Sequence, residues 1–332
     1  MGLRNESGTS QSGHVKDRRK RPSMMKDSTR KRLEITVLSA PALIVFVGFV
    51  IVPVFMAMYY GFFKWKGFGS PSVNGEFVGL QNYAIILQDE TFQKAIWHNL
   101  FIAVMSLVIQ LPLAILFALL LNQKFKGRAL IRTLIFVPYV ISEVIVGTGW
   151  SLLLQSNGAI NDLLGKIGLK GAEWISDPKL ALGTLLVVIS WKYIGFYVIL
   201  MLAGMQSIPE DLYEAAKVDG AGFWQMQKSI TLPLLAPTVR IAAFLSIIGS
   251  LQLFDLVYII WGQYVSDTAG TSTMATYMVR EGRLASNYGY GNAVAVVIFV
   301  ISLAIALVYQ RFILNRDLEG GLTEPTKSKG KK

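Results

Sequence analysis

Uncharged apolar blocks of membrane-spanning length recur along the chain. A helix needs about 20 apolar residues to cross the hydrocarbon core of a bilayer, because no water there can satisfy exposed backbone groups. Six blocks meet or approach that length, and three of them contain one charged residue each, Glu143, Lys192 or Asp255. In chain order they are residues 35–63, 99–122, 133–154, 180–203, 241–260 and 292–310. The pattern predicts an all-α membrane protein with six transmembrane helices.

Lysines and arginines near the ends of the blocks indicate the orientation of the chain, because cytoplasmic loops carry an excess of them. Ten basic residues precede the first block, four lie between the second and third, and six follow the last. The alternate loops carry three, three and two, in residues 64–98, 155–179 and 262–291. Six spans with both termini in the cytoplasm fit this bias.

The same pattern divides the chain into three parts. We expect a basic, disordered cytoplasmic tail at residues 1–34, a six-span domain at 35–315 and a cytoplasmic tail at 316–332. A nucleic-acid-binding arm is the competing interpretation of the first tail. Because most basic residues flank apolar blocks, as membrane topology requires, a solvated segment that fixes orientation explains the net charge of +11 better. We therefore expect a lipid bilayer and no nucleic acid as a partner.

Composition excludes several kinds of chemistry. Hydrophobic residues make up 53% of the chain and charged residues 16%, which excludes a soluble globular enzyme, a disordered protein and a coiled coil. No cysteine is present, and the histidines are His14 and His98 alone. Thiol catalysis, disulfides and cysteine- or histidine-based metal sites are therefore not expected. We expect no catalytic residue, no metal and no cofactor in this chain.

A phosphate-binding loop is also missing. Such a loop needs a glycine, four residues and then Gly-Lys-Ser/Thr, so that backbone amides wrap the phosphates. The nearest approach, Gly158 with Gly165-Lys166-Ile167, has the wrong spacing and no hydroxyl. Energy for any transport must then come from a separate ATPase or from an ion gradient.

The longest inner loop, residues 204–240, has the pattern of a helical elbow. Ser207-Ile208-Pro209-Glu210 has the spacing of a capping box, which predicts a helix over 210–218 that stops at Gly220. A second short helix is predicted over 223–230. The small and apolar residues that the elbow presents are Leu212, Ala215, Ala216, Val218 and Phe223. Such an elbow either docks in a groove of a partner or packs beneath its own bundle.

The elbow resembles a known family. Glu214-Ala215-Ala216, then Gly220, then Ile230-x-Leu232-Pro233 reproduce the "EAA" loop of binding-protein-dependent ABC importer permeases at its full spacing. Further segments are similar to landmarks of the maltose and glycerol-phosphate (MalF/UgpA-like) branch of carbohydrate permeases: 77–83 (FVGLQNY), 158–164 (GAINDLL), 203–209 (AGMQSIP), 254–255 (FD) and 288–293 (YGYGNA). The resemblance leaves out the tail up to about Arg32 and the last dozen or so residues.

This resemblance implies a type I ABC importer permease-like bundle with a cytoplasmic coupling elbow, in the inner cell membrane of a prokaryote. The chain would form half of the pathway of an ATP-driven importer for a carbohydrate, an oligosaccharide in particular. Implied partners are a second permease subunit in a heterodimer, two ATP-binding subunits and an extracytoplasmic sugar-binding protein. The residues implied to couple to the ATPase are Glu214, Ala215, Ala216, Asp219 and Gly220.

One segment departs from the family pattern. After Phe254-Asp255 the family commonly reads Thr-x-Gly-Gly-Pro, whereas this chain reads Trp261-Gly262-Gln263-Tyr264. The shape of the last outer loop cannot be carried over from the family.

Charges inside spans are costly and require partners or a wet cavity. Glu143 and Lys192 are able to pair with each other in the bundle interior. Gln252, Asp255 and Tyr258 are candidates for the substrate pathway, because sugars are held by polar groups among aromatic walls. The spacing of positions 251, 255, 258 and 262 predicts one helical face. Packing or interhelical bonding is the alternative role for these side chains.

Two other functional classes remain open from the residues alone. An ion-coupled secondary sugar transporter would use inverted repeats and charged relays, and would have no use for the EAA spacing. A membrane enzyme such as a glycosyltransferase would need paired acids in a loop, whereas the carboxylates here are scattered. Both alternatives lack an ATPase partner.

Overall fold

The computed structural model describes residues 27–67 and 69–314. The expected tail at 316–332 lies outside these ranges, as does the expected tail at 1–34 up to residue 26. From Asp27 onward that first tail is helical, because α1 begins there. The expectation of disorder therefore does not hold for its last residues.

The contacts divide the chain into two units, with the boundary after Val54. In the first unit, α1 (Asp27–Phe46), the π-helical turn η1 (Val47–Ile51) and the start of α2 (Val52–Tyr60) follow one another without a break. Residues Lys31–Tyr60 form an apolar helix long enough to cross a membrane, and none of its most apolar stretch is buried by this chain.

The second unit holds the remaining elements, almost all of them helical. They are β1 (Phe63–Trp65), α3 (Pro71–Asn74), β2 (Gly75–Phe77), α4 (Gln81–Gln88), α5 (Glu90–Met105), η2 (Ser106–Gln110), α6 (Leu111–Leu121), α7 (Arg128–Val140), α8 (Glu143–Leu153), α9 (Ala159–Lys166), α10 (Ala181–Gln206), α11 (Glu210–Val218), α12 (Phe223–Met226), η3 (Gln227–Thr231), α13 (Leu232–Leu251), α14 (Asp255–Thr268), α15 (Met274–Val279), η4 (Arg280–Leu284), α16 (Tyr288–Tyr309) and η5 (Gln310–Leu314). The strands pair antiparallel, with Phe63 opposite Phe77. This two-stranded ribbon is not part of the sequence prediction.

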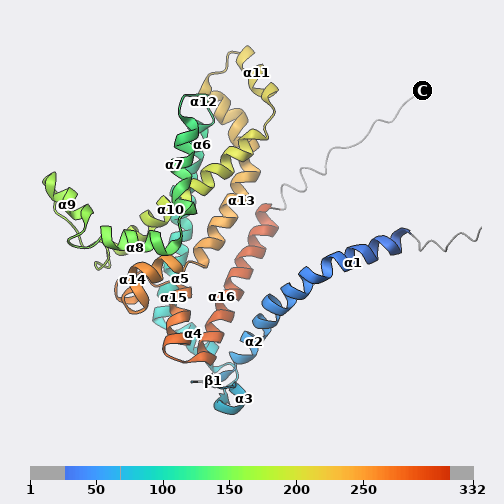
Figure 1. Cartoon of the computed structure of the whole chain (residues 1–332), viewed down its shortest axis with the longest axis vertical. Helices are drawn as coiled ribbons and strands as arrows, with labels where there is room; N and C mark the ends of the chain where they lie inside the picture. Colours follow the sequence, from blue (N-terminus) through green and yellow to red (C-terminus); the bar gives the residue numbers. More distant parts are fainter. Residues whose placement is uncertain (1–26, 68, 315–332) are drawn as a thin grey trace, which may run out of the picture. The chain divides into compact units, whose positions relative to one another are not determined.

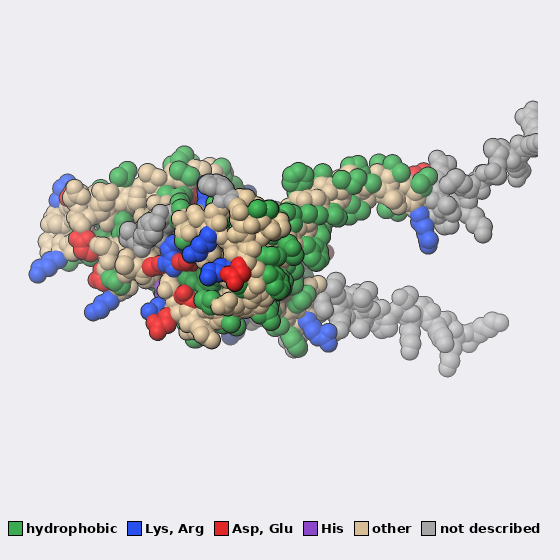
Figure 2. Space-filling model, turned by 90° about the horizontal axis from the view of Figure 1, so that it is seen from below, with side chains coloured by type: hydrophobic (Ala, Val, Ile, Leu, Met, Phe, Trp, Pro, Cys, Tyr) green, Lys and Arg blue, Asp and Glu red, His purple; other side chains and the backbone are tan. Residues whose placement is uncertain are grey.

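The long helices of the second unit run between two different ends (Figure 1). One end carries α11 and α12, and the other carries β1, α3 and α4. Figure 2 views the molecule from the latter end and shows basic and acidic side chains among apolar ones there. Lys64, Lys66, Asp89 and Glu281 line a polar hollow in this region.

Helix α10 lies at the centre of the packing, against α6, α7 and α13. One buried apolar cluster surrounds Leu185 of α10 and Leu256 of α14, and a second surrounds Met201 of α10 and Leu235 of α13. A third cluster, which contains Phe92 and Tyr277, joins α5, α15 and α16. Two of the three clusters therefore include residues of α10. Many apolar side chains on the outer faces of the helices remain exposed.

Five helices are long and apolar enough to span a membrane, and a bent pair raises the number to six within the described residues. Besides the first, the spans are Glu90–Leu121, Ala181–Gln206, Phe223–Gly262 and Tyr288–Ile313. Each of these five spans overlaps one predicted block, although the span that covers the fifth block, 241–260, is interrupted. The block at 133–154 is the one that forms the bent pair.

The third predicted span is not one straight helix. Helices α7 and α8 meet at 95°, and α7, with 13 residues, extends only about 20 Å. Ile141 and Ser142 between them are extended, and the Ser142 hydroxyl caps α8 by accepting a hydrogen bond from the Ile145 amide. Serine is a favoured N-cap and Glu143 a favoured first-turn residue, so this sequence starts a new helix where the hydropathy pattern predicts continuity.

The fifth predicted span also differs from expectation. Helix α13 ends at Leu251, and α14 begins only at Asp255 and is kinked at Gly262, where φ is 67°. Positions 251, 255, 258 and 262 therefore do not share one helical face, and that prediction is wrong. The i, i+4 rule on which it relied requires an unbroken helix.

Candidate functional site

The elbow, residues 210–231, lies at one end of the second unit (Figure 1). Helix α11 ends as the sequence predicts, with Gly220 in the left-handed region at φ 77°. The Ala221 amide donates to the Ala216 carbonyl at 2.9 Å, which satisfies an orphan acceptor of the helix end. A side chain at Gly220 would meet nothing within 4 Å, so backbone conformation rather than space calls for glycine there.

The start of α11 is not the predicted capping box. Its N-cap residue is Pro209, and no side chain caps it. The Ser207 hydroxyl instead donates to the Gly204 carbonyl at 2.7 Å, at the end of α10. The reason is that α10 runs on to Gln206, so Ser207 is engaged by the orphan carbonyls of the preceding helix.

The second arm of the elbow continues without a break into a long helix. The prediction of a short helix over 223–230 is met by α12 and the π-helical turn η3, but α13 then follows directly and runs to Leu251. Pro233 falls in the first turn of α13, where its missing N–H is tolerated because the π-helical turn precedes it. This continuous helical rod, formed by α12, η3 and α13, connects the elbow with the interior of the bundle.

The two faces of the elbow differ. The Tyr213 hydroxyl lies 2.9 Å from the hydroxyl of Thr231, which is fully buried, so this face is fixed to the base of α13. The residues that the sequence singles out lie on the other side: Glu214, Ala215, Asp219 and Gly220 are exposed and Ala216 is half-buried. Val218 is 88% exposed and Trp224 is 62% exposed. This apolar, acidic face has no covering within the described part of the chain.

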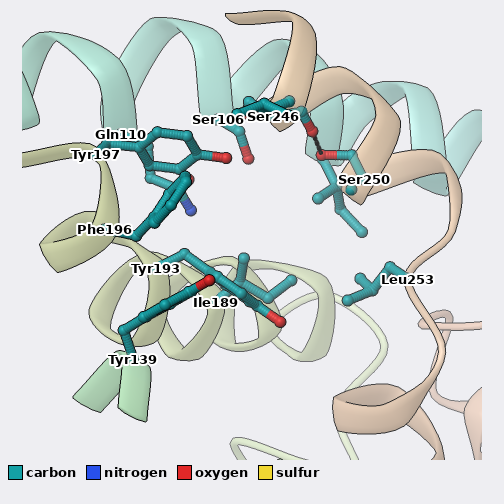
Figure 3. Close-up of a pocket in the computed structure, with 13 residues that line it drawn as sticks. Ser106, Gln110, Tyr139, Ile189, Tyr193, Phe196, Tyr197, Ser246, Ser250 and Leu253 are labelled. Atoms are coloured by element: carbon teal, nitrogen blue, oxygen red, sulfur yellow. Dashed lines mark hydrogen bonds between the residues drawn. The ribbon is translucent and has the colours of Figure 1, made fainter. Parts of the chain in front are cut away.

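A cavity of about 200 Å³ lies among α5, η2, α7, α10 and α13 (Figure 3). It is lined by Ile102, Ser106, Gln110, Tyr139, Ile189, Tyr193, Phe196, Tyr197, Leu245, Ser246, Gly249, Ser250 and Leu253. The aromatic rings come from α7 and α10, and Tyr139 stacks on Phe196 at 5.0 Å and 26°. Hydroxyls and one amide provide the polar groups, and no charged side chain is among the lining residues. Such a lining suits an uncharged polar ligand.

The pathway residues predicted from the sequence do not line this cavity. Gln252 and Asp255 are exposed, and Tyr258 is half-buried and stacks on Phe254 at 5.0 Å. They flank the break between α13 and α14, whose Leu253 does line the cavity. The tyrosines, serines and Gln110 of the cavity were missed, although polar residues inside apolar blocks are the signal that could have found them.

The break after α13 is fixed by one side chain of α5. Asn99 is fully buried and donates to the carbonyl of Ser250 at 2.6 Å, and it accepts from the Met274 amide at 2.9 Å. The Thr273 hydroxyl donates to the Leu253 carbonyl at 2.7 Å. Freed carbonyls at the end of α13 therefore find partners inside the protein, as a break at membrane depth requires.

In two of the segments that resemble the family landmarks, an asparagine side chain holds the local fold through hydrogen bonds to the backbone. Asn82 donates to the carbonyls of Gly61 and Phe63, which ties α4 to the strand ribbon. Asn161 donates to the Ala172 carbonyl at 3.0 Å and accepts from the Trp174 indole at 2.8 Å, which closes the loop at 155–179. In that loop, hydrogen bonds from two serine hydroxyls lower the pKa of Glu173 below its usual value.

The two charges of spans three and four lie together, as the sequence allows. Lys192 Nζ is 3.4 Å from Glu143 Oε1, so the predicted pairing is confirmed. No cluster of three or more metal-ligating His, Cys, Asp or Glu side chains occurs in residues 27–67 and 69–314.

Comparison with known proteins agrees with this arrangement. The model of the family described as "Binding-protein-dependent transport system inner membrane component" matches residues 110–318, a range that includes the elbow and most of the cavity. The trehalose/maltose transport system permease protein MalF of Thermococcus litoralis is 34% identical over 238 residues, 70% of this chain and 78% of the relative. The sulfoquinovosyl glycerol permease SmoG of Agrobacterium fabrum is 33% identical and covers 86% of this chain and 92% of its own.

A solved structure shows the same fold. One chain of a bacterial ABC transporter involved in the import of the acidic polysaccharide alginate matches with a TM-score of 0.74 and 29% identity. The match covers 90% of this chain and 98% of that one. A second structure of a bacterial alginate ABC transporter, in complex with a pentasaccharide-bound periplasmic protein, matches with a TM-score of 0.75.

Proposed function

The chain belongs to the family of binding-protein-dependent transport system inner membrane components, and from this membership we propose how its elbow and its cavity share the work of transport. The protein is the permease of a binding-protein-dependent ABC importer for sugars or oligosaccharides, and it is not an enzyme. It is a multi-pass inner-membrane protein, and a separate ATPase of the complex hydrolyses ATP. Ion coupling and glycosyl transfer are thereby set aside.

The elbow is the docking site for an ATP-binding subunit. Its outer face combines two carboxylates, Glu214 and Asp219, with small alanines that let another backbone approach closely. Its inner face is bonded to Thr231, at the base of the rod that reaches the cavity. A displacement of the docked ATPase would therefore move Ser246 and Ser250 on the cavity wall. The proposal rests on this difference between the exposed outer face of the elbow and its inner face, which is bonded to Thr231.

The cavity is this subunit's share of the cargo pathway. Its volume of about 200 Å³ is below the range of about 300–1,000 Å³ of ordinary ligand pockets. We propose that a second permease subunit completes it in a heterodimer. Two ATP-binding subunits and an extracytoplasmic sugar-binding protein complete the complex. Gln252, Asp255 and Tyr258 lie in or after the break that holds Leu253, and they belong to the same pathway next to the cavity.

Orientation follows from the position of the basic loop. Asn122 and Gln123, at the start of the loop that holds Lys124, Lys126 and Arg128, line a hollow together with residues of the elbow. The positive loop and the elbow therefore lie at the same end, and the excess of positive charge assigns that end to the cytoplasm. With six spans and this inner loop between the second and third, both termini are cytoplasmic in our proposal, and the end with the strand ribbon faces the binding protein.

Site-directed photocrosslinking in the assembled complex tests the docking proposal. A photoreactive amino acid at Val218, which is exposed on the elbow, should give an adduct with the mass of the permease plus one ATP-binding subunit. The same amino acid at Leu163 of α9, which is 62% exposed, should give none with that subunit. Adducts from Leu163 but not from Val218 would contradict both the docking role and the orientation.

A further inference from the structure

Lys192 of α10 is buried beside the bend of the third span, and its ammonium group donates hydrogen bonds to residues of that bend. Its side chain is 3% exposed, and Nζ donates to the carbonyl of Ile141 at 2.6 Å. The carbonyls of Pro138 and Tyr139 lie 3.4 Å away, as does the carboxylate of Glu143. An ammonium group has three protons to donate, so these four acceptors occupy it fully.

The chemistry of the bend explains why a lysine is needed there. The carbonyls of Pro138 and Tyr139 are among the last of α7 and have no partner within that helix once it ends at Val140. A cation placed there also meets the negative end of the α7 dipole, while Glu143 meets the positive end of α8. One lysine of α10 thus satisfies both sides of a break in a neighbouring span.

The same network reaches the cavity wall. The Tyr193 hydroxyl donates to Glu143 Oε1 at 2.7 Å, and Tyr193 lines the cavity. Tyr139, whose carbonyl faces Lys192, lines it from α7 and stacks on Phe196. The position of these rings therefore depends on where α7 ends and on how α8 departs from it.

We propose that Lys192, with Glu143, is a positioning residue that holds the 95° bend of the third span and thereby sets the aromatic wall of the sugar cavity. Lys192 acts on the backbone of the bend and not on cargo. The statement about the wall rests on the proposed role of the cavity, whereas the statement about the bend does not. The rival role, a cation that holds an anionic sugar, conflicts with the geometry, because Lys192 is absent from the cavity lining and its donors are taken.

The bend itself can be measured, because the chain has no native cysteine. Cysteines at Leu134 of α7 and Leu152 of α8, both exposed, accept spin labels on the two arms. Along one straight helix these positions would be about 27 Å apart, and the bend brings them closer. The double variant Lys192→Met with Glu143→Gln removes both charges, so no unpaired buried charge opposes folding. We expect its distance distribution to move towards 27 Å and broaden, and the control Lys170→Met in the outer loop to leave it unchanged.

Exchanging the two charges separates a bend-capping lysine from a simple ion pair. Lys192→Glu with Glu143→Lys restores an ion pair, but a carboxylate at position 192 has no proton for three carbonyls. We expect this variant to keep the altered distance and to lose at least tenfold in uptake, and Glu143→Gln alone to be milder. Normal distance and uptake in the exchanged variant would overturn the proposal.

Uptake assays with neutral and uronate-containing oligosaccharides provide the second readout. The neutralised double variant should lose uptake of whatever sugar the complex accepts, with a raised half-saturation. If the bend distance were unchanged and uptake were lost for anionic sugars alone, Lys192 would be a cargo cation and the proposal would be wrong. If the distance changed while all uptake stayed normal, the positioning of the bend would stand and the assignment of the cavity to the pathway would fail.

Discussion

The hydroxyl groups of Tyr213 and Thr231 lie 2.9 Å apart and join the first helix of the elbow to the base of the rod that forms α13. Thr231 also donates to Gln227 Oε1 at 2.7 Å, so the contact belongs to a short chain of hydrogen bonds. Since Thr231 is fully buried, the elbow cannot tilt without breaking this chain. The bond is a direct mechanical link between the docking face and the cavity.

Replacing Tyr213 by phenylalanine should uncouple ATP hydrolysis from uptake. The ring is kept and one hydrogen bond, worth about 0.5–1.5 kcal/mol, is lost. We expect ATP hydrolysis close to normal and uptake per ATP lowered several-fold in vesicles with the full complex. Thr231→Val removes the same bond from the other side, so the double variant should be little worse than Thr231→Val alone. Additive losses would show that the bond does not transmit motion.

Substitutions of Tyr139 should change cargo affinity in two grades. Tyr139→Ala removes the ring that stacks on Phe196, an interaction worth about 0.5–1.5 kcal/mol beyond burial, and opens the cavity wall. We expect the half-saturation for uptake to rise by about tenfold, while Tyr139→Phe, which keeps the stack, should stay within a few-fold. Equal effects of both variants would assign the contribution to the hydroxyl rather than to the aromatic face.

Asp255 tests the pathway beyond the cavity. If its carboxylate accepts hydrogen bonds from sugar hydroxyls, Asp255→Asn keeps the shape and weakens charge-assisted bonds worth about 1.5–3 kcal/mol each. Half-saturation should then rise, or the choice among sugars should change, with basal ATP hydrolysis intact. Permease abundance and subunit assembly, measured in the same membranes, provide the control. Normal uptake kinetics with reduced assembly would make Asp255 a packing residue.

The sequence predicts those features that depend on local pattern or on few charges. The apolar blocks correspond to spans, Gly220 ends its helix at positive φ, and Glu143 and Lys192 pair because hardly any other charges lie within spans. Each of these follows from one stretch of chain, or from the cost of leaving a charge unpaired in a membrane.

The breaks in two spans depend on distant partners and were missed for that reason. The carbonyl of Ser250 is satisfied by Asn99, which lies 151 residues away, and the carbonyl of Ile141 by Lys192. A hydropathy pattern contains no information on such distant hydrogen-bond donors, so it predicts a continuous helix wherever the residues stay apolar. The cavity was missed with the breaks, because Tyr139 lines it from the last turn of α7 and Leu253 lines it from the break between α13 and α14.

The elbow departs from prediction at its start and not at its end. Ser207 and Glu210 have the spacing of a capping box, but α10 extends far enough to engage Ser207 first. Gly220 has no such competitor, because nothing else approaches it. Local rules therefore hold where a segment is free of neighbours and fail where two helices share a residue.

Uptake and ATP hydrolysis, measured side by side for Glu214→Lys and Gly220→Val in vesicles holding the complete complex, test the coupling role of the elbow most directly. Charge reversal at Glu214 removes an exposed anionic contact, and valine at Gly220 must adopt a φ of 77° that costs about 1–2 kcal/mol. Gly168→Val imposes the same strain on the outer loop, where φ is 79° and nothing lies within 4 Å, and is the matched control. We predict that both elbow variants reach the membrane at normal abundance, lose uptake at least tenfold and lose the stimulation of ATP hydrolysis by sugar-loaded binding protein, while the control keeps both. Normal uptake and normal stimulation in both elbow variants would contradict the coupling role and leave the elbow as a structural cap.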